Sequence, residues 1–576
     1  MNFLFASFGI LFVSSGFSAL CRDPKLKKIF GCGGVFAGAL AGLIPAVEAL
    51  SLGLAWERDF GSPIPGLALV LGCDPLSAFF LVVIFGLSLV ISIYSWDYLS
   101  GQERLLGTLP FFPLLVLAMA AVTVVRDGFL FLICWEVMSL ASFFLVTTEH
   151  ENREVRHAGW IYLIATHLAT AFLAAFFVLL SLKGGSFLFS DFARGGPMAP
   201  VFSGTLFVFA VIGFGTKAGI FPFHVWLPHA HPAAPSYISA LMSGVMIKTG
   251  IYGILRTLSF LPTPPLWWGS LLIIFGLASA FMGILNSAAQ RDFKRLLAYS
   301  SVENMGIMFI GLGLGLLGIS VNRHELVILG FGGGLFHLIN HALFKGALFL
   351  GAGQVLHATQ SRLIDELGGL IKKTPILGSL VLVSSMAIAG LPPLNGFISE
   401  ALIYVGLFRG LQTADGFPLF MMVAAVLGLT FAGALTVMTF GKFFGMIFLG
   451  EARTDKVLKV VPERFSPALG ACLLLVAMCL VTVVFAGPIW SVLQKIVAQI
   501  DPAHQAWEIR EPSLFLFNLG RIFLGFTAAG LFCWLGFRIL WGRRSPRSSV
   551  TWDCGYISPT PRMQYTGSSF VEPLTG

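Results

Sequence analysis

Charged residues are scarce in this sequence. Only 11% of its 576 residues are Asp, Glu, Lys or Arg, against roughly 25% in an ordinary soluble domain. Hydrophobic residues make up 56% of the chain, and its mean hydropathy is +0.87. These values exclude a water-soluble globular protein and leave no room for a sizeable soluble domain, because a transmembrane helix needs about 20 apolar residues. The composition predicts an all-α polytopic membrane protein.

Paired cysteines are also missing. Eight cysteines occur, at positions 21, 32, 73, 134, 472, 479, 533 and 554, without a Cys-x-x-Cys pair. The usual spacings of iron–sulfur and zinc sites are therefore absent. We expect no metal, cofactor or redox centre in this chain. The net charge of +8 does not indicate a nucleic-acid partner, because the basic residues fall mainly in short loops between apolar runs, where they orient membrane helices.

Apolar runs between charged or Pro/Gly-rich breaks predict about fifteen transmembrane helices. The first run lacks the basic segment of a cleaved signal peptide, so we interpret it as a retained helix. The predicted spans are 3–20, 29–52, 77–97, 108–124, 128–147, 160–182, 203–222, 237–257, 266–287, 297–318, 327–354, 376–409, 417–449, 467–492 and 514–540.

Lysine and arginine in the loops set the predicted orientation. Most of them fall on the side of Arg22–Lys28, and this side is cytoplasmic by the positive-inside rule. The N-terminus is then outside and the C-terminus cytoplasmic, in an inner or plasma membrane of a bacterium or archaeon. We divide the chain into an N-terminal three-helix region (1–107), two five-helix units (108–260 and 261–450), C-terminal helices (451–550) and a cytoplasmic docking tail (551–576).

Five basic residues fall inside predicted spans at least five residues from either end. They are Lys217, Lys248, Lys345, Lys442 and Arg521. A charge at the centre of a bilayer helix costs at least about 2.5 kcal/mol on insertion scales, so such residues usually face a bundle interior and have a function there.

The seventh span is predicted to be broken around its lysine. Three glycines and Pro222 surround Lys217 in the sequence GFGTKAGIFP, and broken helices at membrane depth occur where they line protein or water. This pattern indicates an ion site. The structural alternative is a kinked packing helix whose lysine extends to the membrane interface.

The twelfth span repeats this device. The sequence Gly390-Leu-Pro-Pro-Leu-Asn-Gly396 interrupts a long apolar run, and Glu400 follows. Two interrupted helices five spans apart suggest that spans 4–8 and 9–13 are inverted repeats, because a unit with an odd number of helices changes its orientation when it is placed twice in succession.

Titratable residues mark other spans as well. His337, His341 and Lys345 recur at intervals of four on one helical face, which favours a proton relay over a metal site, since no third ligand is evident. The structural alternative is a stripe of hydrogen-bonded histidines. The predicted proton-translocation residues are Glu136, Lys217, Lys248, His337, His341, Lys345 and Glu400, with His167, Glu303 and Lys442 as further members.

Several ordered motifs resemble one membrane-protein family. They are Trp135-Glu136, Lys217 with PFHVWLP (222–228), Pro235-Ser236 before Lys248, LLAYS (296–300), His337-x3-His341-x3-Lys345, and the Gly390 motif with Glu400. They resemble the antiporter-like proton-channel subunits of respiratory complex I, Mrp-type cation/proton antiporters and membrane-bound hydrogenases. The sequences HAHPAAPS (229–236) and VENMG (302–306), with the tail around Cys554 and Tyr565, resemble the hydrogenase-4 and formate hydrogenlyase branch.

The resemblance implies a proton-translocating membrane subunit of an oxidoreductase complex, with a gating ion pair between Glu136 and Lys217. It implies that Lys248 and the His337 stripe form a hydrated central axis and that Glu400 is an exit-side or inter-subunit carboxylate. Nickel–iron and iron–sulfur centres are expected in partner subunits. The expected partners are other antiporter-like membrane subunits, cytoplasmic hydrogenase-like and iron–sulfur subunits, and membrane lipid, with no nucleic acid. The alternative is a free-standing or Mrp-type cation/proton antiporter subunit.

Overall fold

The computed structural model describes residues 2–61, 68–412, 415–501, 510–541, 560 and 563–570. Fourteen helices in this described part are long and apolar enough to cross a membrane. One further crossing is interrupted and consists of α16 (Pro375–Ile388) and α17 (Asn395–Leu411). The predictions of an all-α polytopic membrane protein and of about fifteen spans are confirmed.

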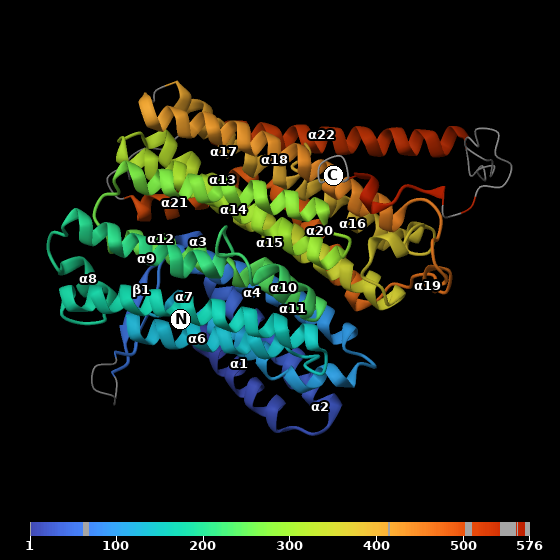
Figure 1. The fold of residues 1–576 in the computed structure, drawn as a ribbon, viewed down its shortest axis with the longest axis horizontal. Helices are drawn as coiled ribbons and strands as arrows, with labels where there is room; N and C mark the ends of the chain where they lie inside the picture. Colours follow the sequence, from blue (N-terminus) through green and yellow to red (C-terminus); the bar gives the residue numbers. More distant parts are fainter. Residues whose placement is uncertain are drawn as a thin grey trace.

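The N-terminal region begins at one edge of the molecule and extends into its middle (Figure 1). It contains α1 (Asn2–Leu20), α2 (Pro24–Lys28), the π-helical turn η1 (Ile29–Gly33), α3 (Gly34–Leu52) and α4 (Pro75–Tyr98). Strands β1 (Trp56–Asp59) and β2 (Val70–Cys73) between α3 and α4 pair antiparallel, with Trp56 opposite Cys73.

The next group of helices contains the first broken span. Its members are α5 (Phe111–Val124), α6 (Gly128–Val146), α7 (Arg153–Gly184), α8 (Phe189–Arg194), α9 (Pro200–Ala218), α10 (Leu227–Ala233), α11 (Ser236–Leu241), the π-helical η3 (Met242–Met246) and α12 (Lys248–Leu258). Helix α9 forms most of the predicted seventh span, and α10 follows after the break at 219–226.

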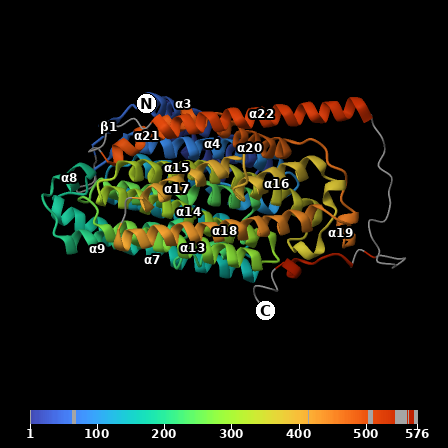
Figure 2. The same ribbon diagram turned by 90° about the horizontal axis from the view of Figure 1, so that it is seen from above.

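The second group of helices packs beside the first and contains the second broken span (Figure 1). It consists of α13 (Leu266–Ala289), α14 (Phe293–Ser320), α15 (His324–Thr359), the interrupted pair α16 and α17, and α18 (Gly416–Phe448). In the orthogonal view, α14, α15 and α17 lie between a layer with α4, α20 and α22 and a layer with α7, α13 and α18 (Figure 2).

The C-terminal helices are α19 (Asp455–Leu458), α20 (Pro467–Val484), α21 (Ala486–Ile500) and α22 (Arg510–Trp541). The predicted span 467–492 is too long, because α20 ends at Val484 and α21 begins as a separate helix. Helix α21 buries one face, which includes Trp490, Leu493 and Ile496. Helix α22 runs along the opposite edge of the molecule from α1 (Figure 1).

Aspartates start three of the central helices. Asp74, Asp127 and Asp292 accept backbone hydrogen bonds from the first turns of α4, α6 and α14, as N-cap residues do. Asp74 also binds Arg256 through both oxygens, at 2.7 and 2.9 Å, and it lies 3.3 Å from Arg126. Burial alone would raise the pKa of Asp74, but Arg256 and Arg126 outweigh it and hold this pKa well below its usual range. This cluster ties the start of α4 to the end of α12.

The most buried helices are α14, α15 and the run from α11 to α12. Helices that are buried all round belong in a protein interior. Close contact is possible because small residues meet, as in transmembrane helix pairs generally: a Cβ atom on Gly306 would lie only 2.4 Å from the carbonyl oxygen of Gly276 in α13. The predicted ionisable residues of α12, α14 and α15 are therefore enclosed by protein.

Candidate functional site

Lys217 lies in the last turn of α9, directly before the first break. The helix ends because Gly219 adopts a φ of 75°, which disfavours residues with a side chain. The Lys217 side chain is 1% exposed. Its Nζ donates hydrogen bonds to Ser139 Oγ of α6 at 2.9 Å and to the Tyr162 hydroxyl of α7 at 3.1 Å. The predicted break is confirmed, and it places a buried cation among hydroxyl groups.

Glu136 lies one turn before Ser139 on α6 but contacts another partner. Its Oε2 is 3.5 Å from Nε2 of His167 on α7, whose Nδ1 bonds to Leu163 O. The Glu136 carboxylate is close enough to Lys217 to act on it electrostatically. Both side chains are described, and no ion pair joins them, because the ammonium group of Lys217 donates to Ser139 and Tyr162 instead. The expected Glu136–Lys217 ion pair is therefore not formed in this structure.

Lys248 joins the first group of helices to the second. It begins α12 directly after the π-helical η3, a type of helix that often occurs at functional sites. Lys248 Nζ lies 2.5 Å from the carbonyl oxygen of Ser243 and 2.5 Å from Nδ1 of His341 on α15. Both side chains are fully buried. The contact puts a lysine and an imidazole within proton-transfer distance at the centre of the molecule.

The predicted His337, His341 and Lys345 stripe lies on one unbroken helix, α15. At one end of the stripe, His337 Nε2 donates to Asn304 Oδ1 of α14 at 3.1 Å. Its Nδ1 lies 3.0 Å from the hydroxyl oxygen of Ser399 on α17. The stripe therefore connects the second broken span to α14 and, through His341, to Lys248 on α12.

Lys345 ends the stripe against α14. Its Nζ donates to Leu297 O at 2.8 Å and to Ser300 Oγ. The Lys345 charge also acts on Glu303, which is only 1% exposed and accepts a hydrogen bond from Thr436 of α18. The sequence placed Glu303 near the start of a span, but α14 begins at Phe293, so the carboxyl group lies well inside the bundle.

Glu400 lies beside the second break, in the second turn of α17. Gly390 has a φ of +62°, and a Cβ atom there would lie 2.9 Å from Glu400 Oε2. The break thus leaves room for the carboxylate. Asn340 of α15 binds the start of α17 by donating to Asn395 O at 2.7 Å. Glu303 is close enough to Glu400 for the two carboxyl groups to interact electrostatically.

Lys442 on α18 lies away from this network, near one end of the bundle. Its Nζ donates to Ala288 O at 2.7 Å and to Gln290 O at 2.9 Å. These carbonyl groups belong to the C-terminal end of α13, where a cation is favourable. A structural role in capping α13 accounts for these contacts. Arg521, the remaining basic residue predicted inside a span, lies on α22.

Two buried basic residues escaped the sequence analysis as site candidates. The predicted span 297–318 leaves Lys294 in the preceding loop, but α14 starts at Phe293, and the side chain is 2% exposed. The N-cap signal of Asp292 would have placed the start of the helix correctly. His231 on α10 is fully buried, and neither of its ring nitrogens has a hydrogen-bond partner among the described residues. No sequence signal distinguishes His231 from its neighbour His229.

Residues 563–570 of the C-terminal tail contact other segments of the same chain. Gly567 N donates to Asp365 Oδ1 at 2.6 Å, and Arg453 Nη2 donates to Tyr565 O at 2.9 Å. Gln564 exchanges hydrogen bonds with the backbone of Glu451. Trp552, Cys554 and Tyr556, on which the docking prediction also rests, lie outside the described residues.

No group of three His, Cys, Asp or Glu side chains in the described part could hold a metal ion.

Family comparison covers the part of the chain that holds these buried charges. Residues 126–428 match the model of the NADH:quinone oxidoreductase/Mrp antiporter transmembrane family. The chain belongs to this family. Residues 67–106 match the N-terminal model of complex I chain 5. Family membership confirms the predicted resemblance, and the matched region includes every predicted translocation residue except Lys442.

Relatives of this family member cover nearly its whole length. Hydrogenase-4 component B of Escherichia coli is 35% identical over 99% of this chain and 85% of that protein. Formate hydrogenlyase subunit 3 of the same organism is 33% identical over 98% of this chain and 91% of that protein. Among solved structures, a subunit of an archaeal membrane-bound sulfane sulfur reductase has a TM-score of 0.73 at 22% identity, over 85% of this chain and 77% of that chain. This likeness shows that the two chains share one fold.

Proposed function

We propose that this chain is the proton-translocating membrane subunit of a hydrogenase-4 or formate hydrogenlyase type of oxidoreductase complex. It couples electron transfer in partner subunits to ion movement, and it carries no redox centre itself. The observation that carries the proposal is the Lys248–His341 contact, which joins a buried lysine of the first group of helices to the titratable stripe of the second.

The translocation route follows this series. Glu136 and Lys217 form its first part, Lys248 and His341 its centre, and His337, Lys345, Glu303 and Glu400 its second part. Glu136 acts electrostatically on Lys217 in the first part, and from Lys248 onward neighbouring members touch or act on each other electrostatically. Intramembrane chains of Lys, Glu and His are typical of proton relays, and a structural role alone does not require so many buried charges. His167 belongs to the first part through its contact with Glu136, and Lys442 lies outside the series, at the end of α13.

Partner subunits are supported by the exposed face of α6 and α7. Glu136 and His167 lie near the middle of their helices, yet their side chains are 27% and 50% exposed. Polar groups at membrane depth are costly in lipid, so we infer that a neighbouring antiporter-like membrane subunit covers them. The cytoplasmic partners would be hydrogenase-like and iron–sulfur subunits that contain the nickel–iron and iron–sulfur centres. The tail at 551–576 contributes to the surface on which these partners assemble.

Two architectural proposals accompany this function. The distribution of basic residues supports an N-terminus outside the cell and a cytoplasmic C-terminus. The break at 219–226 interrupts span 7, and the break at 389–394 interrupts span 12. Because these spans occupy the same position in the two groups of five, the breaks support a pair of inverted five-helix repeats.

The test is purification of the tagged chain in mild detergent, followed by identification of co-purifying subunits and reconstitution into proteoliposomes. We expect hydrogenase-like subunits to co-purify and hydrogen-dependent reduction of viologen to drive ion movement. A chain that purifies with cation/proton antiporter subunits alone, and exchanges Na⁺ for H⁺ without a redox reaction, would contradict the proposal and establish the Mrp-type alternative. That family also shares the matched model.

A further inference from the structure

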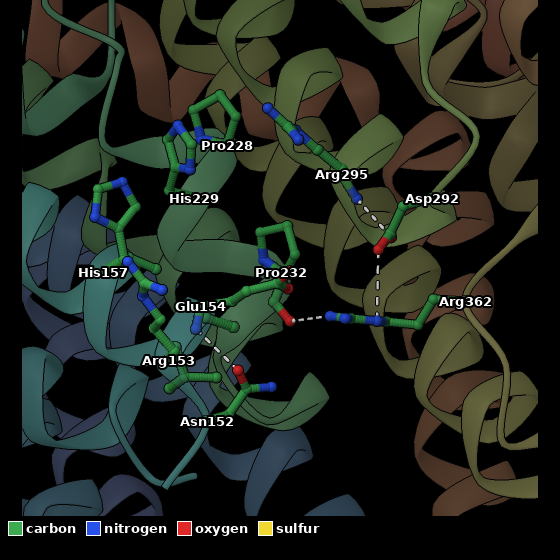
Figure 3. Close-up of a pocket in the computed structure, with 13 residues that line it drawn as sticks. Asn152, Arg153, Glu154, His157, Pro228, His229, Pro232, Asp292, Arg295 and Arg362 are labelled. Atoms are coloured by element: carbon green, nitrogen blue, oxygen red, sulfur yellow. Dashed lines mark hydrogen bonds and ion pairs between the residues drawn. The ribbon is translucent and has the colours of Figure 1, made fainter. Parts of the chain in front are cut away.

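Two adjoining cavities open at the end of the bundle where α7, α10, α14 and α15 meet. One has a volume of about 500 Å³ and the other of about 280 Å³. Their shared walls are Asn152, Val155, Pro232, Ala233 and Arg362. Figure 3 shows the larger cavity, in which Arg362 bridges Pro232 and Asp292. These cavities lie on the side that we propose to be cytoplasmic.

Lys294 forms the inner wall of the smaller cavity. Its Nζ donates to Ala234 O at 2.5 Å and approaches Pro232 O at 3.4 Å. The charged groups that act on it are Arg362, Asp292 and Glu149. Lys294 therefore touches both the cavity and the connection between α10 and α11, although it is almost completely buried.

His231 lies further inside, on α10. Its backbone oxygen accepts a hydrogen bond from Ser239 at 2.7 Å, and its ring packs between Trp226 and Phe349 at centroid distances of 6.0 and 5.8 Å. The charged groups close enough to act on it are Lys345, Lys294 and Lys248. Two of these lysines belong to the central series, and the third is the lysine of the cavity.

We propose that Lys294 and His231 are proton-relay residues that connect the surface cavities to the central Lys248–His341 and Lys345 groups. This inference rests on the proposed ion-translocating function and adds to it the place where protons enter or leave. An imidazole with both nitrogens unpartnered can accept a proton on one nitrogen and release one from the other. Lys294 can exchange protons with water in the cavity.

The chemistry of this entrance also selects the ion. Hard cations such as Na⁺ take oxygen ligands from carboxylates and carbonyls. The larger cavity has three arginines, Arg153, Arg295 and Arg362, against the two carboxylates Glu154 and Asp292, and the adjoining smaller cavity has Lys294 and Arg362 against Glu149. A positive lining disfavours metal cations, whereas a relay of lysine and histidine transfers protons. The proposed substrate of this route is H⁺.

The experiment uses the assembled complex in proteoliposomes and measures proton movement per electron transferred. In His231→Gln, the side chain keeps hydrogen-bonding capacity without titrating. In Lys294→Arg, it keeps the charge and the carbonyl bonds but does not release a proton. We expect each change to lower the ratio by about tenfold or more while all subunits still co-purify. The matched control is Lys183→Met, because Lys183 also donates to a carbonyl oxygen, Pro197 O at 2.6 Å, but is only half-buried.

A further variant separates a relay from a structural cation. Lys294→Met should fail in either case, so normal proton movement in Lys294→Arg together with loss in Lys294→Met would overturn the proposal. Unchanged proton movement in His231→Gln would overturn it as well. If His231→Gln does not assemble, Lys294→Arg decides alone, and failure of both to assemble would make the two residues structural.

The remaining outcomes separate this inference from the function on which it rests. A wild-type complex that moves no ions would contradict the proposed function itself, before any variant is compared. Replacement of Na⁺ by choline should leave proton movement unchanged. A strict requirement for Na⁺ would overturn the assignment of H⁺ to this route.

Discussion

Both broken spans are interrupted at a glycine, but the charged residue beside the break is a lysine in the first span and a glutamate in the second. In the first, Lys217 lies before the break, in the last turn of α9. In the second, Glu400 lies after the break, in the second turn of α17. Each break contains a glycine with positive φ, Gly219 and Gly390 respectively.

The difference follows from the ends of the helices. The C-terminal end of a helix favours a cation, and the N-terminal end favours an anion, but the effect fades after the first turn. Lys217 is therefore supported by α9 itself and by two hydroxyl groups, whereas Glu400 receives less support from α17. A break can thus hold either charge, and its sign depends on which half-helix carries the residue.

The largest effect should come from the lysine of the first break. Lys217→Met removes the cation that Ser139 and Tyr162 bind, so redox-driven ion movement should fall by at least about tenfold. Lys217→Arg should not rescue it, because guanidinium does not release a proton. Proteoliposomes of the assembled complex measure the rate, with Lys25→Met at an exposed position as control. Normal ion movement in Lys217→Met would remove the first break from the route.

The carboxylate of the second break should matter less. Glu400→Gln keeps the shape and hydrogen-bonding capacity of the side chain, and Glu303 is close enough to supply a second carboxyl group. We expect a decrease of about three- to tenfold in the same assay, and a further decrease in the double variant with Glu303→Gln. The control is Glu57→Gln in the exposed strand β1. A loss as complete as that of Lys217→Met would show that the two breaks are equivalent.

Alanine at the two glycines separates backbone strain from the chemistry of the site. A left-handed conformation costs a residue with a side chain about 1–2 kcal/mol, so Gly219→Ala and Gly390→Ala should both lower thermal stability in detergent. A Cβ atom would reach Leu227 in the first break but the Glu400 carboxylate in the second. Gly390→Ala should therefore also reduce ion movement. Gly441→Ala on α18, where a Cβ would meet nothing within 4 Å, is the control.

The smallest effect should come from His167. Exposed ion pairs contribute about 0.2–1 kcal/mol, and this one is separated by 3.5 Å. His167→Gln should change ion movement by no more than about fivefold, measured beside Glu136→Gln. Equal and large losses in both variants would mean that the pair, rather than Glu136 alone, transfers the ion.

Local signals predicted much of the fold from the sequence. Long apolar runs located the spans, because every backbone group in lipid must be satisfied within a helix. Both breaks were predicted correctly, since glycine and proline act locally on the backbone. The prediction failed at 467–492, where continuous apolarity gave no sign that α21 separates from α20.

The sequence by itself determined most of the ionisable residues that lie within the spans and that His337, His341 and Lys345 share one helical face. Only the tertiary structure decided their partners. Glu136 lies against His167 rather than Lys217, and Lys248 meets His341 across 93 positions of the chain. Lys294 and His231 stand out only through burial and the cavities beside them. The physical reason is that helix periodicity fixes neighbours three or four residues apart, whereas contacts between helices depend on packing that no local pattern encodes.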